Sequence, residues 1–227
     1  MENYIFLLSI IYFLYVQAKS IQPNCTSEGV ARTRAFKNLK EYQGNKISFN
    51  SQDVGFEGNH VTFLFDNIDR IPKNGFISFT SENVVNITLR NKSVRTIDEG
   101  AFISLNCLQY LDLSYNEVTN ISVNMFEGLD NLRTLDLSNN KIEFIPYLVF
   151  SNLRSIRSLD LSGNVIKKID RFGLHNITSL ERLVLAENKI KVFPSYCFEE
   201  SENIKELDIR GNAFGYVDII SFDGLDS

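Results

Sequence analysis

The 227-residue sequence contains no tryptophan and only 3 cysteines, 4 prolines and 2 histidines. Three cysteines are too few for a disulfide-rich scaffold, and their odd number leaves at least one thiol free or shared with another chain. Basic residues are not in excess, since 23 Lys and Arg stand against 28 Asp and Glu, for a net charge of -5. Such a chain has no basic surplus to condense on phosphate backbones, so we expect no nucleic-acid ligand. With 44% hydrophobic and 22% charged residues, the composition predicts a globular protein of one or two domains.

Long apolar runs are also absent, except at the amino terminus. Residues 5–16 are almost all apolar, and small residues follow in Val16-Gln17-Ala18 and Ala18-Lys19-Ser20. The run is too short to cross a bilayer comfortably, and the small residues stand where a signal peptidase cleaves. We therefore predict a signal peptide at residues 1–20 and a secreted mature chain. An uncleaved anchor is the alternative, because the first four residues contain no Lys or Arg.

A pattern recurs every 24 residues through most of the chain. Its first position is occupied by Leu108, Leu132, Ile156, Leu180 and Ile204. Each unit continues as Leu-x-x-Leu-x-Leu-x-x-Asn-x-Ile or a close variant. The register extends upstream to Val84, with Lys92 at the Asn position, and one shorter, irregular unit begins near Val61. The total is about seven repeats, and a period of this length is typical of solenoids.

These repeats resemble the leucine-rich repeat family in its 24-residue extracellular type, over residues 60–227. The resemblance implies an α/β solenoid, a curved right-handed horseshoe with a parallel β-sheet on its concave face and mostly loop or short 3-10 structure on the convex side. The physics agrees, since Tyr110-Leu111-Asp112-Leu113 alternates as a strand does, and equivalent positions in the next unit would stack about 4.8 Å away. Residues 60–102 also resemble the opening of secreted insect leucine-rich immune proteins and of Toll-like receptor ectodomains.

Two columns of the repeat are expected to be structural. One is an asparagine ladder, in which a buried amide would bond main-chain groups that the coil leaves unpaired. Its members are Asn116, Asn140, Asn164, Asn188 and Asn212. The other is an aromatic core column of Phe102, Phe126, Phe150, Phe198 and Phe222, with Leu174 in the same register.

The segment before the repeats, residues 21–59, lacks the register, and we predict an N-terminal cap there with short strands at residues 47–49 and 54–56. Extracellular proteins of the family usually carry paired cysteines in this cap, whereas the segment contains only Cys25. Cys107 is its nearest possible partner along the chain, and Cys197 is expected to lie about three turns away. Spacing alone leaves the pairing open.

At the other end, the chain stops at Ser227 with a full unit and without a C-terminal cap. A solenoid without a polar terminal coil exposes the leucines of its last repeat. Three explanations are open: the chain is a fragment of a longer protein, it forms a homo- or heterodimer through the bare end, or the open end is tolerated. We favour the fragment.

Catalysis is not expected. His60 and His175 are the only imidazole bases, and they fall in the first and fifth units. Four turns of about 4.8 Å separate them by roughly 20 Å, too far for one site. No Gly-rich phosphate loop, zinc-ligand spacing or nucleophile elbow occurs in the sequence. We expect both histidines at surface or turn positions, and neither an enzyme activity nor a cofactor or metal.

Outward side chains of the predicted sheet, in coils three to seven, would form a continuous surface suited to a large ligand. Aromatic residues and arginines among mixed charges are typical of binding hot spots. The candidates are Tyr110, Tyr115, Arg133, Asp136, Arg157, Asp160, Arg182, Glu206 and Asp208. For the aspartates we favour a solvated or hydrogen-bonded scaffold role, and attraction of a cation or a basic ligand is the alternative.

Five Asn-x-Ser/Thr sequons predict N-glycosylation at Asn24, Asn86, Asn91, Asn120 and Asn176. Asn86 and Asn91 fall at expected outward positions of the second coil. Glycans there would cover the amino-terminal part of the concave face and leave coils three to seven to a ligand.

The resemblance implies extracellular recognition of a protein or a microbial surface component, in innate immunity or at the cell surface. Two alternatives stay open. The chain is the amino-terminal part of a transmembrane receptor or adhesion protein, or it is a structural protein of the extracellular matrix. Contact with a membrane is expected only if the chain is part of a longer receptor.

Overall fold

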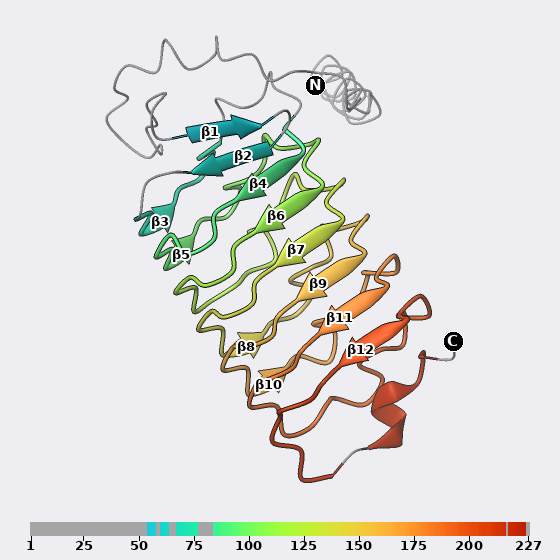
Figure 1. Cartoon of the computed structure of the whole chain (residues 1–227). Coiled ribbons are helices and arrows are strands. Elements are labelled where there is room, and N and C mark those ends of the chain that lie inside the picture. The colour runs from blue at the N-terminus through green and yellow to red at the C-terminus, as the bar shows by residue number, and fades with distance from the viewer. Residues whose placement is uncertain (1–53, 58–59, 64–66, 77–83, 217, 226–227) are drawn as a thin grey trace, which may run out of the picture.

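The structure is a computed structural model that describes residues 54–57, 60–63, 67–76, 84–216 and 218–225. The predicted signal peptide, most of the predicted cap, Asn24 and Cys25 lie outside these residues. Eight strands form one sheet in the order β1-β2-β4-β6-β7-β9-β11-β12 (Figure 1). Their bounds are β1 (Val54–Glu57), β2 (His60–Phe63), β4 (Asn86–Thr88), β6 (Tyr110–Asp112), β7 (Thr134–Asp136), β9 (Ser158–Asp160), β11 (Arg182–Val184) and β12 (Glu206–Asp208).

The first strand differs from the others in direction. β1 pairs antiparallel with β2, whereas every later neighbour pair in this sheet is parallel. The strand predicted at residues 54–56 is confirmed by β1, and the strand predicted at residues 47–49 lies outside the described residues. From β2 to β12 the sheet therefore has seven parallel strands, one for each repeat of the sequence pattern.

The 24-residue period brings the same repeat position into register on every strand. Leu135 of β7 pairs with Leu111 of β6 on one side and with Leu159 of β9 on the other. All three leucines have no exposed surface. Only the central residue of each three-residue strand points into the coil, so each coil buries its apolar side chains against its two neighbours.

The second half of the coils contains shorter strands. β3 (Arg70–Ile71) pairs with β5 (Thr96–Ile97), and β8 (Phe144–Ile145) pairs with β10 (Lys168–Ile169), both in parallel. The helix of the described residues is a single 3-10 turn, η3 (Ile219–Phe222). Figure 1 shows the coils stacked in a row with the main sheet along one side. The predicted solenoid with a parallel sheet is therefore confirmed, with very little helix in the described part.

The phenylalanine column lies in the core as stacked pairs. The pairs, with the distances between ring centroids, are Phe76–Phe102 (5.4 Å), Phe126–Phe150 (5.9 Å) and Phe198–Phe222 (5.6 Å). Leu174 takes the equivalent position in the fifth coil and is 1% exposed. Stacked rings bury a large apolar area, so this column stabilises the contact between successive coils.

His175 takes the second of the two expected positions, surface or turn, and is buried there. His175 lies in a turn, as expected, but only 9% of it is exposed. Its ring packs edge-on against Phe172 at 4.7 Å, and Phe172 packs edge-on against Tyr147 at 5.8 Å. His175 Nδ1 lies 3.6 Å from a carboxylate oxygen of Glu200. His60 is half-buried, with Nε2 3.2 Å from Oγ1 of Thr88.

The two described cysteines differ in state. Cys107 is disulfide-bonded, whereas Cys197 is a free thiol and 1% exposed. Burial raises the pKa of the Cys197 thiol to about 12. The unpaired thiol expected from the odd cysteine count is therefore Cys197.

The apolar side chains of β12 are less covered than those of the strand before it. Leu207 and Ile209 are half-buried, whereas Leu183 and Leu185 have no exposed surface. Each coil depends on its neighbours for burial, so the last described strand has cover on one side only. No helix of the described residues is both long and apolar enough to cross a membrane.

Candidate binding surface

The outward side chains of five adjacent strands form a surface that we call the sheet face. Its first row is Tyr110, Thr134, Ser158, Arg182 and Glu206, and its second row is Asp112, Asp136, Asp160, Val184 and Asp208. Tyr110, Asp136, Asp160, Arg182, Glu206 and Asp208 were candidates from the sequence. The other three candidates lie elsewhere: Arg133 and Arg157 directly precede strands, and Tyr115 follows one.

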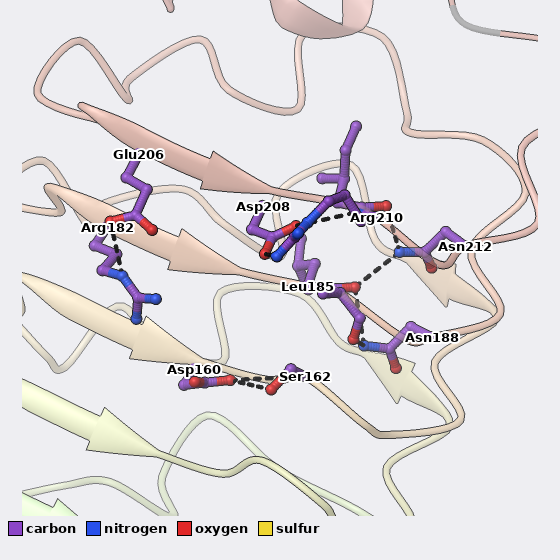
Figure 2. Close-up of polar contacts among 11 residues, drawn as sticks. Asp160, Ser162, Arg182, Leu185, Asn188, Glu206, Asp208, Arg210 and Asn212 are labelled. Atoms are coloured by element: carbon purple, nitrogen blue, oxygen red, sulfur yellow. Dashed lines mark hydrogen bonds and ion pairs between the residues drawn. The ribbon is translucent and has the colours of Figure 1, made fainter.

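The aspartates of the second row close the turns that follow their strands. Asp160 Oδ1 accepts hydrogen bonds from the main-chain N (2.9 Å) and Oγ (2.6 Å) of Ser162, as Figure 2 shows. Asp136 Oδ1 accepts from the main-chain N of Ser138 at 2.8 Å, and Asp112 repeats the arrangement. An aspartate that bonds its own main chain two residues on forms an Asx-turn, so these side chains have a structural use.

Burial raises the pKa of Asp136, which lies between Asp112 and Asp160 in the second row. The like charges of Asp160 and Asp112 raise this pKa further, whereas the hydrogen bonds from Ser138 lower it. Within the described residues, no group of three or more His, Cys, Asp or Glu side chains is arranged to hold a metal ion.

At the carboxyl-terminal end of the sheet face, the charged groups are paired with one another (Figure 2). Arg210 donates to Asp208 from Nε (2.9 Å), Nη2 (2.7 Å) and its main-chain N (3.1 Å). These bonds lower the pKa of Asp208 to about 2. Arg182 Nε donates to Glu206 at 2.8 Å. The predicted candidates Arg182, Glu206 and Asp208 therefore lie together in two ion pairs.

The asparagine ladder ties each coil to the one before it. The Leu185 carbonyl oxygen accepts from Asn188 Nδ2 of its own coil (3.1 Å) and from Asn212 Nδ2 of the next coil (2.8 Å), as Figure 2 shows. Asn188 Oδ1 accepts in turn from the main-chain N of Ile166 at 3.0 Å. Asn116, Asn140 and Asn164 make the same set of bonds. All are buried except Asn212, which is half-buried.

The residue before each ladder asparagine adopts a left-handed backbone, as does Asn91 before Lys92, which stands at the ladder position of the second coil. The φ angles are 53° at Asn91, 56° at Tyr115, 53° at Asn139, 65° at Gly163, 54° at Glu187 and 67° at Gly211. Glycine and asparagine tolerate this region best, so their recurrence at this repeat position is a sequence signal that would have indicated the turn. The outward strand position expected for Tyr115 was therefore wrong, because the residue lies in the turn.

Tyr115 has a neighbour that the sequence did not indicate. Tyr115 is 48% exposed, and its ring centroid lies 4.1 Å from the guanidinium carbon of Arg90. Arg90 Nη1 also donates to Oγ of Ser114 at 2.8 Å. Arg90 and Tyr115 lie in neighbouring coils, just after the ends of β4 and β6. Tyr115 occupies the same repeat position as Asn91, the residue after Arg90, which brings the two side chains together.

At the opposite edge of the sheet, a groove of about 490 Å³ crosses five coils. We call it the strand-start groove. The residues that directly precede the strands form one row, which is Gln109, Arg133, Arg157, Glu181 and Lys205. The residues two positions earlier form the second row, which is Asn131, Ser155, Ser179 and Asn203. The predicted candidates Arg133 and Arg157 lie next to each other in the first row.

The charges of the strand-start groove are unevenly paired. Glu181 accepts from Lys205 Nζ at 2.9 Å and from Arg157 Nη1 at 3.2 Å. The hydrogen bond and the charge of Lys205 lower the pKa of Glu181, and the charge of Arg157 adds to this. The guanidinium of Arg133 is exposed and makes no hydrogen bond, ion pair or ring contact with any described residue. One cation of the groove is therefore available to a ligand.

Four of the five sequons fall in the described residues. Asn86 is half-buried on β4, and Asn91, Asn120 and Asn176 are exposed in turns or loops. Asn91 was expected at an outward strand position and lies instead in the turn after β4. A glycan on Asn91 would therefore stand at the edge of the sheet face.

A family model described as leucine rich repeat matches residues 82–142, 111–166, 131–190 and 154–214. Together these segments cover more than half of the 227 residues. No match to the sequence was found among curated proteins.

Several solved structures are similar in fold. The TLR13–ssRNA13 complex has a TM-score of 0.65 at 24% identity, over 68% of this chain and 22% of that chain. The LRIM1/APL1C complex has a TM-score of 0.60 at 20% identity, over 67% and 28%. The Toll–Spatzle complex of Drosophila has a TM-score of 0.56 at 26% identity, over 59% and 19%. The match thus spans less than a third of each of these longer chains.

The residues that the family model matches form the coils whose leucines and asparagines are in register. The chain belongs to the leucine-rich repeat family.

Proposed function

We propose that this chain is an extracellular recognition module that binds a protein partner across the sheet face and the strand-start groove. The observation that carries the proposal is the surface over five strands, from β6 to β12, whose first row is polar on every strand, beside a groove with an arginine whose guanidinium is unpaired among the described residues. A curved or flat array of repeats offers a large surface rather than a small pocket, which suits a macromolecular ligand.

Three features support an extracellular location. Cys107 is disulfide-bonded, and disulfides persist in oxidising compartments. Four described sequons are present, three of them at exposed asparagines. The apolar run at residues 5–16 has the length and flanking residues of a signal peptide.

A role in innate immunity is the finer part of the proposal. It rests on likeness to Toll, solved with Spatzle as a hub of Drosophila development and innate immunity, and to LRIM1, solved with APL1C. TLR13 was solved with single-stranded RNA. For this chain we favour a protein or microbial surface component over RNA, because its net charge is -5. We also infer that it has no catalytic activity.

Photo-crosslinking from defined surfaces tests the proposal. A photo-reactive amino acid replaces Ser158, in the middle of the sheet face, and the protein is irradiated in extracellular fluid of its source organism. A control protein carries the same group at Val123, which is 36% exposed and lies in the second half of a coil. We expect a discrete crosslinked protein from the Ser158 position and none from Val123. Crosslinks from Val123 alone, or from neither site, would contradict the proposal.

A further inference from the structure

The strand-start groove has the dimensions of a peptide site. Its first row has one residue in each of five successive coils, from Gln109 to Lys205. Successive coils are about 4.8 Å apart, so the row is on the order of 20 Å long. An extended chain advances about 3.3 Å per residue, and the groove therefore accommodates roughly six residues.

The main-chain N–H groups of the first row are not available to a ligand. The main-chain N of Arg157 donates to Arg133 O (2.8 Å), that of Glu181 donates to Arg157 O (2.8 Å), and that of Lys205 donates to Glu181 O (2.8 Å). These groups are already used within the solenoid. A peptide cannot add to the floor of the groove as a further strand, so recognition has to come from side chains.

The side chains favour an anionic ligand. Three cations and one anion line the groove, whereas the whole chain has a net charge of -5. Glu181 is shared by Arg157 and Lys205, and the guanidinium of Arg133 has no partner among the described residues. A guanidinium binds a carboxylate through two parallel hydrogen bonds, which gives geometry as well as charge.

The uncharged lining favours a peptide over a single-stranded nucleic acid. None of the described residues that line the groove is aromatic, and ring stacking is the usual means of holding unpaired bases. Asn131 Nδ2 donates to Asn106 O at 2.7 Å and Asn203 Nδ2 donates to Thr178 O at 2.8 Å. These bonds orient both amides and leave their oxygens as acceptors for the N–H groups of a bound main chain.

We propose that the strand-start groove binds an extended, carboxylate-rich peptide segment of the partner protein, with Arg133 as its anchoring cation. The proposal rests on the protein-recognition function above and names the chemistry of the partner at one part of that surface. Glu181 offsets part of the positive charge of the groove by pairing with Arg157 and Lys205, so it lowers the affinity for an acidic peptide.

Fluorescence anisotropy with a labelled hexaglutamate peptide tests this directly, with a hexaglutamine peptide of equal length as reference. We expect the hexaglutamate peptide to bind and the hexaglutamine peptide to bind at least ten-fold more weakly. Arg133→Glu should weaken hexaglutamate binding at least ten-fold, and Glu181→Gln should strengthen it. Binding should weaken as the salt concentration rises from about 50 to about 200 mM, because the Debye length is roughly halved.

Lys191→Glu is the matched control, since Lys191 is exposed, has no partner among the described residues and does not line the groove. It makes the same charge change as Arg133→Glu and should leave binding within two-fold of wild type. Equal loss in both variants would reduce the effect to net charge and overturn the proposal. So would equal binding of the two peptides.

A heparin hexasaccharide as competitor separates peptide from polyanionic sugar. Displacement of the peptide by the sugar at a lower concentration than by unlabelled hexaglutamate would overturn the peptide assignment. The crosslinking experiment at Ser158 does not depend on this probe. If crosslinking succeeds and hexaglutamate does not bind, the recognition function stands and the acidic-peptide proposal falls.

Discussion

Asn140 is hydrogen-bonded to Leu113 of the preceding coil, with 3.0 Å between Nδ2 and the carbonyl oxygen, although the two residues are 27 positions apart. The same amide nitrogen bonds Leu137 O at 3.1 Å, and Asn140 Oδ1 accepts from the main-chain N of Val118 at 3.0 Å. One side chain thus satisfies main-chain groups in two coils. A buried main-chain group without a partner is costly, so the asparagine couples the folding of neighbouring coils.

Asn140→Ala is therefore expected to destabilise the protein by about 1–3 kcal/mol, because it leaves buried main-chain groups unpaired. Asn212→Ala removes an equivalent set of bonds at a half-buried position, where water can replace them, and should cost less. Urea unfolding followed by circular dichroism measures both. A loss at Asn140 no larger than that at Asn212 would count against the buried-ladder explanation.

Gly163→Ala should also destabilise the protein, by about 1 kcal/mol, because Gly163 has a φ of 65° and any side chain is strained there. A Cβ atom would also stand 2.7 Å from Oδ1 of Asn139. Gly215→Ala is the control, since its Cβ would meet no atom within 4 Å and its φ is not in the left-handed region. The difference in thermal midpoint between the two variants is the measurement, and equal midpoints would contradict the prediction.

The features that could be predicted from the sequence are the periodic ones. Leu111 and Leu135 stand 24 residues apart at the same motif position, so register, strand direction and burial follow from the repeat itself. The asparagine ladder follows for the same reason. The physical cause is that each coil has only its neighbours to pack against, so one position of the repeat has one environment.

What could not be predicted depends on contacts between particular side chains. His175 is buried and Phe172 packs against its imidazole, a contact that no periodic position indicates. The charge pairing of the strand-start groove depends on Glu181 lying between the two cations Arg157 and Lys205, and these side chains differ from one repeat to the next. The left-handed turn at Tyr115 was missed although Gly163 and Gly211 stand at the same position.

Cys197 should be chemically inert in the folded protein. Burial raises the pKa of its thiol to about 12, and the thiolate is the form that reacts with disulfide reagents. We expect Ellman's reagent at pH 8 to detect no fast-reacting thiol in the native protein and one thiol after unfolding in guanidinium without reductant. Cys197→Ser should abolish the signal of the unfolded sample. Rapid reaction in the native state would show that the thiol is not enclosed.

The pKa of Asp208 should depend on Arg210. The hydrogen bonds from Arg210 lower it from 3.8 to about 2, so the folded state binds the proton more weakly than the unfolded state does. The resulting stability is present above about pH 4 and is lost as the pH falls through about 2. Carboxyl-carbon NMR titration should find the Asp208 pKa near 2 in wild type and closer to 3.8 in Arg210→Gln.

The pKa of Asp136 is shifted in the opposite direction to that of Asp208. Burial raises its pKa, so its contribution to stability is present below 3.8 and is lost as the pH rises through the folded value. Arg210→Gln should leave the Asp136 titration unchanged, because Arg210 is not among the groups that shift it. A parallel shift of both residues would point to a general change in the sheet face rather than to the loss of one partner.

Glycans at Asn86 and Asn91 should restrict a partner to the later coils. Asn86 lies on β4, next in register to Tyr110 of β6, and Asn91 is exposed in the turn that follows. Both asparagines belong to sequons. Thr88→Val and Ser93→Ala each remove one sequon and keep its asparagine, so each variant secreted from eukaryotic cells should lose the mass of one glycan. Intact mass spectrometry before and after enzymatic deglycosylation measures this. If both variants keep the wild-type mass, the amino-terminal part of the sheet face is open, and a partner that binds coils three to seven must be selected by side chains alone.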